Sequence, residues 1–291
     1  MATDPPTKAD QMTNRCARFP RWIGVLAVIG LAAGAGWAPA YAQSQSTVRV
    51  GGTGMALAAM RQVGENLTSI DRSVTIEVLP SLGTPGGLRA LDDRAIDVAV
   101  IGRPLTDNER VGGFSQVMCL ATPLLFATSH PSPPGIARAD VPGFYSRPNP
   151  TWPDGTPLKI LLRSRAGSEN GYLVAAIPGM ADALENAYKT PGVPVATTDQ
   201  ENAELALRID GSFAIMTLLQ IRGERLRLQM MPLDGVAPTL DNVSARTYPL
   251  VVRVCVVVPA SPTSGAAKFV EYLSSGPGLA LMRSLGAVPV K

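Results

Sequence analysis

The chain has 291 residues, of which 46% are hydrophobic and only 17% are charged, so it can bury a core in one large domain or in two compact lobes. Its 26 basic and 23 acidic residues leave a formal net charge of +3. It contains no block of Lys and Arg and no basic stripe interleaved with aromatic residues, which are the patterns that nucleic-acid-binding proteins use. We therefore expect an ordered main body with no nucleic-acid partner.

The N-terminus has the pattern of an export signal. Basic residues between positions 8 and 21 precede an apolar run over residues 22–37 that is short for a membrane span, and an A-x-A cleavage site ends at Ala42. We expect residues 1–42 to be a signal peptide and the protein to be periplasmic or secreted after cleavage near Ala42. An uncleaved anchor is the alternative, and translation can begin at Met1 or at Met12.

Strand and helix patterns alternate along the first half of the mature chain. Residues 48–50, 74–79 and 95–101 have strand patterns, while residues 56–66 and 88–93 have helical patterns between them. This order predicts a layer of parallel strands whose loops gather at the carboxyl ends of the strands.

The second half begins with a segment rich in Pro and Gly. Residues 130–157 have no apolar periodicity, so we expect surface loops there, with His130 among them. Strand patterns then return at residues 158–162, 193–196, 212–216 and 251–258. Helical patterns lie from residue 172 onward and at residues 202–209, 265–273 and 278–284.

The sequence lacks the residues that most catalytic sites need. His130 is the one histidine of the chain, so a His-centred metal cluster or a catalytic triad cannot be argued. Neither the G-x-G-x-x-G spacing nor a phosphate-binding P-loop occurs in the sequence. We therefore expect no enzymatic activity, no metal and no cofactor.

Three loops offer a cradle for an anion instead. Residues 51–54, 81–84 and 163–170 each combine small residues and hydroxyl groups near the predicted start of a helix. Free backbone N–H groups and the helix dipole favour an anion at such a place. The third loop adds Arg163 and Arg165, whose guanidinium groups can bond an oxyanion in bidentate fashion. Together the loops predict a site for a small anion.

A set of motifs resembles the phosphate-binding proteins of ABC importers, within the wider class of two-lobed periplasmic binding proteins. The most specific part is DGVAPTLDNVSARTYPL at residues 234–250, which accompanies GGTGM at residues 51–55 and SLGTPGG at residues 81–87. The resemblance runs from about residue 48 to the end of the chain. It implies an α/β fold of the two-lobed type II class, with mixed sheets and a hinge of crossover strands.

The same resemblance implies a division of the chain and a function. Lobe one is expected at residues 43–125, with residues 254–291 returning to it, and lobe two at residues 126–253. A monomer would capture phosphate or a related oxyanion in the cleft between the lobes and deliver it to an ABC permease in the inner membrane. The expected ligand-binding residues are Thr53, Gly54, Met55, Ser81, Leu82, Gly83, Arg103, Arg163, Gly167, Ser168, Glu169 and Asn170.

Two loops depart from the family pattern. Ile101 and Gly102 stand where the family carries a Ser and an Asp that accepts a hydrogen bond from protonated phosphate, and Glu169-Asn170 stand where Gly-Thr is usual. Glu169 can substitute as the acceptor; otherwise sulfate, molybdate, a phosphonate or an organic phosphate is the expected ligand. Asp199 precedes a predicted helix, and we expect it to be an N-cap rather than a ligand contact.

Two cysteines of the mature chain, Cys119 and Cys255, lie in apolar and β-branched runs that read as buried strands. In the family that the chain resembles, such runs lie near the crossovers between the lobes. A disulfide between these cysteines would then staple the hinge of an exported protein. Two buried free thiols are the alternative.

Functions of other classes also stay open. A ligand-sensing module that feeds a membrane receptor would use the same fold and cleft. A hydrolase of phosphate esters would show activity that depends on Ser168 or Glu169. A structural protein without a ligand would tolerate alanine at every cleft residue.

Overall fold

The computed structural model describes residues 46–290, so the expected signal peptide and start sites lie outside the described residues. The strands are β1 (Ser46–Gly52), β2 (Val74–Val78), β3 (Val98–Ile101), β4 (Phe114–Thr128), β5 (Lys159–Ile160), β6 (Leu162–Arg163), β7 (Val195–Ala196), β8 (Ser212–Thr217), β9 (Gln229–Met230), β10 (Val251–Pro259) and β11 (Val288–Val290). The helices are α1 (Gly54–Ile70), α2 (Gly83–Asp92), α3 (Asp107–Val111), the 3-10 helix η1 (Arg138–Asp140), α4 (Val141–Ser146), α5 (Ser168–Ala176), α6 (Met180–Lys189), α7 (Asp199–Arg208), α8 (Leu218–Gly223), α9 (Leu240–Ser244), α10 (Ser264–Ser274) and α11 (Gly276–Ser284).

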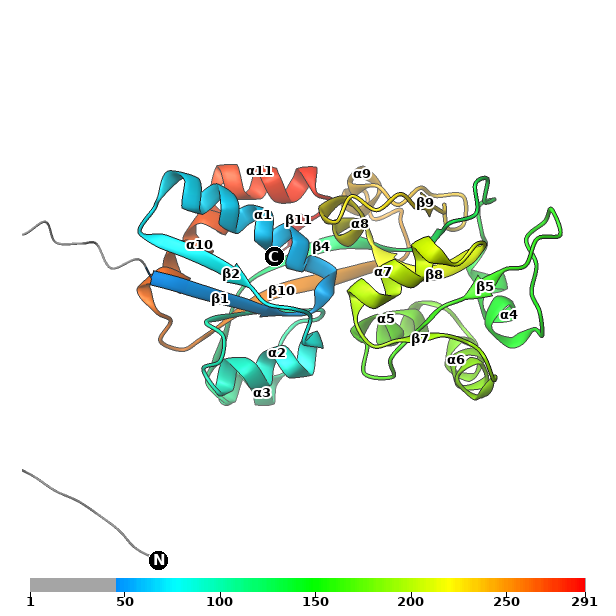
Figure 1. The fold of residues 1–291 in the computed structure, drawn as a ribbon, viewed down its shortest axis with the longest axis horizontal. Coiled ribbons are helices and arrows are strands. Elements are labelled where there is room, and N and C mark those ends of the chain that lie inside the picture. The colour runs from blue at the N-terminus through cyan, green and yellow to red at the C-terminus, as the bar shows by residue number, and fades with distance from the viewer. Residues whose placement is uncertain (1–45, 291) are drawn as a thin grey trace, which may run out of the picture. The chain divides into compact units, whose positions relative to one another are not determined.

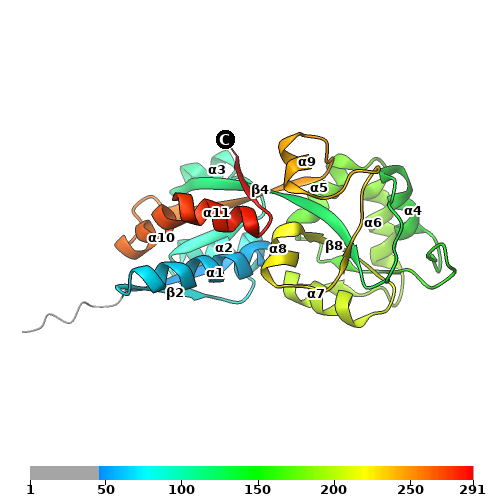
Figure 2. The same cartoon turned by 90° about the horizontal axis from the view of Figure 1, so that it is seen from above.

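The long strand β4 joins two lobes. Its residues up to Pro123 pair with β10 and β11, and its residues from Leu124 onward pair with β8 and β9. Figures 1 and 2 show β4 passing from the part of the molecule that holds α1, α2, α10 and α11 to the part that holds α5, α6 and α7. We call residues 46–123 and 251–290 lobe one, and residues 124–250 lobe two.

Lobe one is built on parallel strands, as the sequence predicts. β1 pairs in parallel with both β2 and β3, while β10 pairs with β3 and β4 in the antiparallel sense, which makes the sheet mixed. In Figure 1, α1 lies above these strands and α2 lies below them. Since helices cover both faces, every residue of β3 is buried.

Several helices begin earlier than apolar periodicity predicts. α1 begins at Gly54, α2 at Gly83 and α5 at Ser168, so part of each expected loop is the first turn of a helix. These first turns consist of small and polar residues, which carry no apolar period. Gly87 on α2 is required for packing, because a Cβ there would lie 2.7 Å from the Cα of Gly52. The predicted anion cradles are therefore true helix N-termini.

Lobe two contradicts the prediction that residues 130–157 are surface loops. The segment contains η1 and α4, and Trp152 is 2% exposed. His130, expected at the surface, is 7% exposed; its ring stacks on Trp152 at 4.8 Å between centroids, and its Nε2 lies 2.9 Å from Asp154 Oδ2. Phe144, Tyr145 and Trp152 pack singly around the buried ring of Phe213 on β8, so the segment is buried without an apolar period.

The two crossover strands are linked covalently. Cys119 on β4 lies opposite Cys255 on β10, and the two form a disulfide with 4.0 Å between their Cα atoms. The bridge lies in a small apolar cluster of lobe one that includes Ile101 and Val257. Among residues 46–290, no helix combines the length and the apolar character that a membrane span needs.

Candidate ligand-binding site

A cavity of about 350 Å³ lies between the two lobes. We call it the cleft cavity. Lobe one contributes Thr53, Ser81, Leu82, Gly83, Thr84, Pro85, Gly86 and Arg89 to its lining. Lobe two contributes Arg163, Ser164, Ala166, Gly167, Ser168, Glu169, Thr197 and Asp199. The helices α1, α2, α5 and α7 all begin at this lining, so the positive ends of four helix dipoles face one space.

The structure brings most of the expected ligand-binding residues together. Those that line the cleft cavity are Thr53, Ser81, Leu82, Gly83, Arg163, Gly167, Ser168 and Glu169. Gly54 lies just behind them, where its N–H donates to Ser81 Oγ at 3.1 Å. Met55 is a core residue at 2% exposure. Asn170 donates its amide hydrogens to the Ser164 carbonyl and the Tyr188 hydroxyl, and so supports the loop from outside the cavity.

Arg103 does not line the cleft cavity. It forms two hydrogen bonds with Glu109, from Nη1 at 2.8 Å and from Nη2 at 2.7 Å. Its side chain instead lines a neighbouring cavity of about 380 Å³, together with Tyr172. This second space meets the cleft cavity at Thr84 and Ser168, which line both.

Direct hydrogen bonds connect the lobes across the cleft. Thr84 Oγ1 and Ser168 Oγ are 3.0 Å apart, and Thr53 Oγ1 lies 3.5 Å from Asp199 Oδ2. Gln200 Nε2 donates to the carbonyl of Gly54 at 3.3 Å. The lobes therefore stand in a closed arrangement in which hydroxyl groups of both sides face the same space.

Arg163 is held at the buried end of the cleft cavity by groups of its own lobe. Its Nε donates to Glu169 Oε1, its Nη1 donates to the carbonyls of Ala196 and Thr198, and its Nη2 lies 3.2 Å from Asp199 Oδ1. The side chain is 5% exposed. A guanidinium with these partners has no free edge for bidentate contact with an oxyanion, which differs from the role that the sequence suggests for it.

Burial sets the titration of this cluster. Burial raises the pKa of Glu169; Arg163 opposes that effect and the neighbouring Asp199 adds to it. Burial also opposes the charge on Arg163, but the attraction of Asp199 and Glu169 outweighs it, so the pKa of the guanidinium rises. The arginine is therefore a fixed cation between two carboxyl groups.

The expectation that Asp199 is an N-cap is wrong. Thr198 is the N-cap of α7 and accepts from the Glu201 N–H at 3.1 Å, so Asp199 is the first residue inside the helix. Its carboxylate is buried and lines the cleft cavity. Thr197 and Thr198 precede Asp199 in the sequence, and because threonine is itself a good N-cap, they could have indicated that the helix begins at Asp199. Thr84, from the predicted loop at residues 81–84, lines the cavity, and Arg89 lines it without having been predicted.

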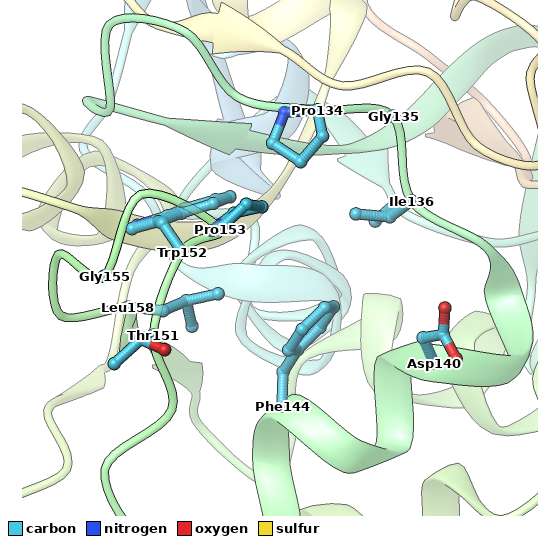
Figure 3. A pocket seen from close by; sticks show the side chains of 10 residues that line it. All are labelled: Pro134, Gly135, Ile136, Asp140, Phe144, Thr151, Trp152, Pro153, Gly155 and Leu158. Carbon is cyan, nitrogen blue, oxygen red and sulfur yellow. The ribbon is translucent and has the colours of Figure 1, made fainter.

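A third cavity, of about 360 Å³, lies within lobe two. It has apolar walls formed by side chains that include Trp152, Phe144, Ile136 and Leu158, and Figure 3 shows these side chains facing a shared space. Its polar side chains are Asp140 and Thr151. Within the described part of the chain, no group of three or more His, Cys, Asp or Glu side chains could hold a metal ion.

Comparison with known families places the chain in a class. A family model described as a PBP superfamily domain matches residues 33–276, and the chain therefore belongs to the PBP superfamily. The two-lobed α/β fold and the resemblance predicted from the sequence are confirmed. No curated protein matches the chain.

Three solved structures illustrate the similarity. One is a protein from Clostridium perfringens that was solved with bound phosphate and is described as a proposed phosphate ABC transporter substrate-binding protein. Its TM-score is 0.71 at 14% sequence identity, and the alignment covers 84% of this chain and 100% of that one. An ABC-type phosphate transport receptor from Vibrio cholerae has a TM-score of 0.57 at 14% identity, over 84% and 100%. The effector-binding domain of QuiR in complex with shikimate has a TM-score of 0.52 at 10% identity, over 79% and 95%. Such identities show a shared fold.

Proposed function

We propose that the mature chain is an extracytoplasmic solute-binding protein that captures phosphate or a related oxyanion-bearing solute in the cleft cavity and delivers it to an ABC importer. One observation carries the proposal: four helix N-termini and the hydroxyl groups of both lobes line a single space between the lobes. Helix N-termini stabilise negative charge, and hydroxyl groups supply directed hydrogen bonds.

The proposed binding step uses both lobes at once. Ser81 and Thr84 of lobe one and Ser168 of lobe two would donate hydrogen bonds to the oxyanion. Because Thr84 and Ser168 already meet at 3.0 Å, a ligand that bonds to both favours the closed arrangement over an open one. Closure around the solute would present one lobe surface to a permease, and no chemical step is involved.

Location and partners follow from the same proposal. The predicted signal peptide at residues 1–42 would carry the protein to the periplasm or outside the cell. The partner would be an inner-membrane permease that accepts the closed form of a monomer. The comparison with the importer proteins of Clostridium perfringens and Vibrio cholerae supports this assignment through the fold.

Thermal unfolding of residues 43–291 against oxyanions tests the proposal. The panel comprises phosphate, arsenate, sulfate, molybdate, phosphonates and sugar phosphates. A ligand at one hundred times its Kd stabilises the fold by about 2.7 kcal/mol, which raises the Tm of a domain of this size by roughly 5–10 °C. We expect a rise with at least one oxyanion, reduced by Ser168→Ala and unchanged by Ser244→Ala, an exposed serine on α9. No rise with any oxyanion would contradict the proposal.

A sensing role is the second candidate. The similarity to the effector-binding domain of QuiR shows that this fold also serves proteins other than importers. A sensor would bind its ligand in the same cavity, but deletion of the gene would leave uptake of that ligand unchanged. Uptake of the radiolabelled ligand by the deletion strain separates the two roles, because only the importer predicts a loss.

A further inference from the structure

The two sides of the cleft cavity differ in electrostatic character. On the lobe one side, the first turns of α1 and α2 contain no acidic residue. On the lobe two side, the first turn of α5 contains Glu169 and the first turn of α7 begins with Asp199. The positive end of α2 is therefore uncompensated, whereas those of α5 and α7 are matched by buried carboxyl groups. The positive end of α1 faces Asp199 of lobe two, whose Oδ2 lies 3.5 Å from Thr53 Oγ1.

The lobe one side is built for an anionic group. α2 has 10 residues and carries a full helix dipole toward the cavity, while the α1 N-terminus also faces Asp199 of lobe two. Ser81 and Thr84 supply hydroxyl groups beside these N-termini, and Arg89 adds a positive charge at the exposed rim. An oxyanion placed here meets donors without facing a carboxylate of the same lobe.

The lobe two side has an excess of acceptors. Glu169 and Asp199 are 3% and 5% exposed and share one cation, Arg163, so two carboxyl groups stand against one guanidinium. Arg163 donates from Nε to Glu169 and from Nη1 to the carbonyls of Ala196 and Thr198, and its Nη2 lies 3.2 Å from Asp199 Oδ1. The second oxygen of Asp199 lies 3.5 Å from Thr53 Oγ1 and keeps accepting capacity at the cavity wall. A second anion on this side would be repelled.

The size of the cavity exceeds the need of an inorganic oxyanion. Five heavy atoms at about 30 Å³ for each water-sized group would fill about 150 Å³, whereas the cleft cavity has a volume of about 350 Å³. A solute of about eight heavy atoms would occupy about 240 Å³ on the same scale. The space therefore accommodates an organic chain between the two sides.

We propose that the ligand is a zwitterion, whose oxyanion binds the α2 N-terminus of lobe one beside Ser81 and Thr84 and whose ammonium group binds Asp199 and Glu169 of lobe two. The inference rests on the proposed function and names the substrate class of the same cavity. An ammonium group adds a second cation to a cluster of two carboxyl groups and one guanidinium, and its three N–H donors match the available carboxyl oxygens. The oxyanion and the ammonium group would together pull the lobes closed.

A matched pair of probes tests the inference by calorimetry. O-phosphoethanolamine and ethyl phosphate carry the same phosphate ester and differ in the ammonium group, and inorganic phosphate is the third probe. We expect the wild-type protein, residues 43–291, to bind O-phosphoethanolamine at least tenfold more tightly than ethyl phosphate. Asp199→Asn should reduce this preference to less than threefold, while Asp182→Asn, on α6 outside the cavity, should leave it unchanged.

The outcomes separate the inference from the proposed function. Equal affinity for the two esters, or tighter binding of inorganic phosphate than of O-phosphoethanolamine, would overturn the inference and leave an oxyanion-binding protein. A preference that survives both Asp199→Asn and Glu169→Gln would overturn the assignment of the ammonium site. The absence of binding to all three probes and to every other oxyanion of the thermal panel would overturn the proposed function as well.

Discussion

Two arginine–glutamate pairs with the same sequence spacing have different roles in this molecule. Arg103 and Glu109 are six residues apart, as are Arg163 and Glu169, and each arginine lies at or just after the end of a strand that leads toward the cleft. The side chains of the first pair are 35% and 22% exposed, and those of the second are 5% and 3% exposed. The two pairs therefore differ in burial and not in sequence spacing.

The surroundings of the two pairs explain their roles. Glu109 also closes the capping box of α3, because it accepts from the Thr106 N–H at 2.8 Å while Thr106 Oγ1 accepts from the Glu109 N–H. The Arg103 pair therefore stabilises a local turn in contact with water. Asp199 forms a second ion pair with Arg163, and all three side chains line the cleft cavity. Only the second pair links fold stability to the ligand site.

The largest expected effect is the loss of the buried arginine. Arg163→Met leaves Glu169 and Asp199 buried without a cation, which should destabilise the protein by about 3–5 kcal/mol. Arg103→Met removes a partly exposed pair and should cost about 0–1 kcal/mol. Urea denaturation at neutral pH measures both. Equal losses would show that burial does not separate the pairs.

A combined variant controls for simple loss of packing. Arg163→Met together with Glu169→Gln and Asp199→Asn removes all three charges, so it should recover most of the stability that Arg163→Met loses. No recovery would mean that the arginine stabilises lobe two through its contacts with the carbonyls of Ala196 and Thr198 instead.

The second prediction concerns pH, where the two glutamates should act in opposite directions. The hydrogen bond from Arg103 lowers the pKa of Glu109 to about 2, so its contribution is present above its ordinary pKa of 4.5 and is lost as the pH falls toward 2. Burial raises the pKa of Glu169, so its contribution is present below 4.5 and is lost as the pH rises through the raised value.

Variants turn these opposite signs into a measurement. The stability of Glu109→Gln relative to wild type should rise as the pH falls from 5 toward 3, because the unfolded wild-type chain takes up a proton at Glu109 in this range while the folded ion pair stays ionised. The stability of Glu169→Gln relative to wild type should rise as the pH rises above 4.5 through the raised pKa of Glu169, because wild type loses the contribution of Glu169 in that range. Urea denaturation across this range checks both slopes, and parallel curves would contradict the assignment.

The sequence predicted the parts of the site that depend on local pattern. The glycine and hydroxyl content of residues 51–54 and 81–84 marks strand-to-helix turns, and these turns do line the cleft cavity. The parallel order of β1, β2 and β3 followed from alternating periods. Both features are set by neighbouring residues, so one sequence is enough to find them.

The features that were missed depend on contacts between distant residues. Thr53 and Asp199 are 146 positions apart and meet only because the lobes close, so no local pattern places the Asp199 carboxylate at the cleft cavity. Arg103 is an exception, because its loop matches a family position but its guanidinium pairs with Glu109, six residues away. His130 lies among Pro residues and is nevertheless buried by Trp152.

The smallest expected effect on stability comes from Gly54→Ala, which alters the contact between the start of α1 and Asp199 of the buried cluster. A Cβ at Gly54 would lie 2.7 Å from both Cβ and Oδ2 of Asp199, and 2.5 Å from Gln200 Oε1. Gln200 can turn away, but the Cβ of Asp199 is fixed to α7, so Gly54→Ala should hold the lobes apart. Because alanine suits a helix, we expect a change in the free energy of unfolding of less than about 1 kcal/mol and at least a tenfold loss of ligand affinity.

Small-angle scattering and calorimetry together check this prediction. Gly54→Ala should have a larger radius of gyration than wild type, and it should fail to contract when the ligand is added. Gly171→Ala on α5 is the matched control, because a Cβ at Gly171 meets no atom within 4 Å. If Gly54→Ala closes and binds as wild type does, the contact between Asp199 and the α1 N-terminus does not define the closed state. The electrostatic difference between the two sides of the cavity would then have to act across a wider gap, where water screens it.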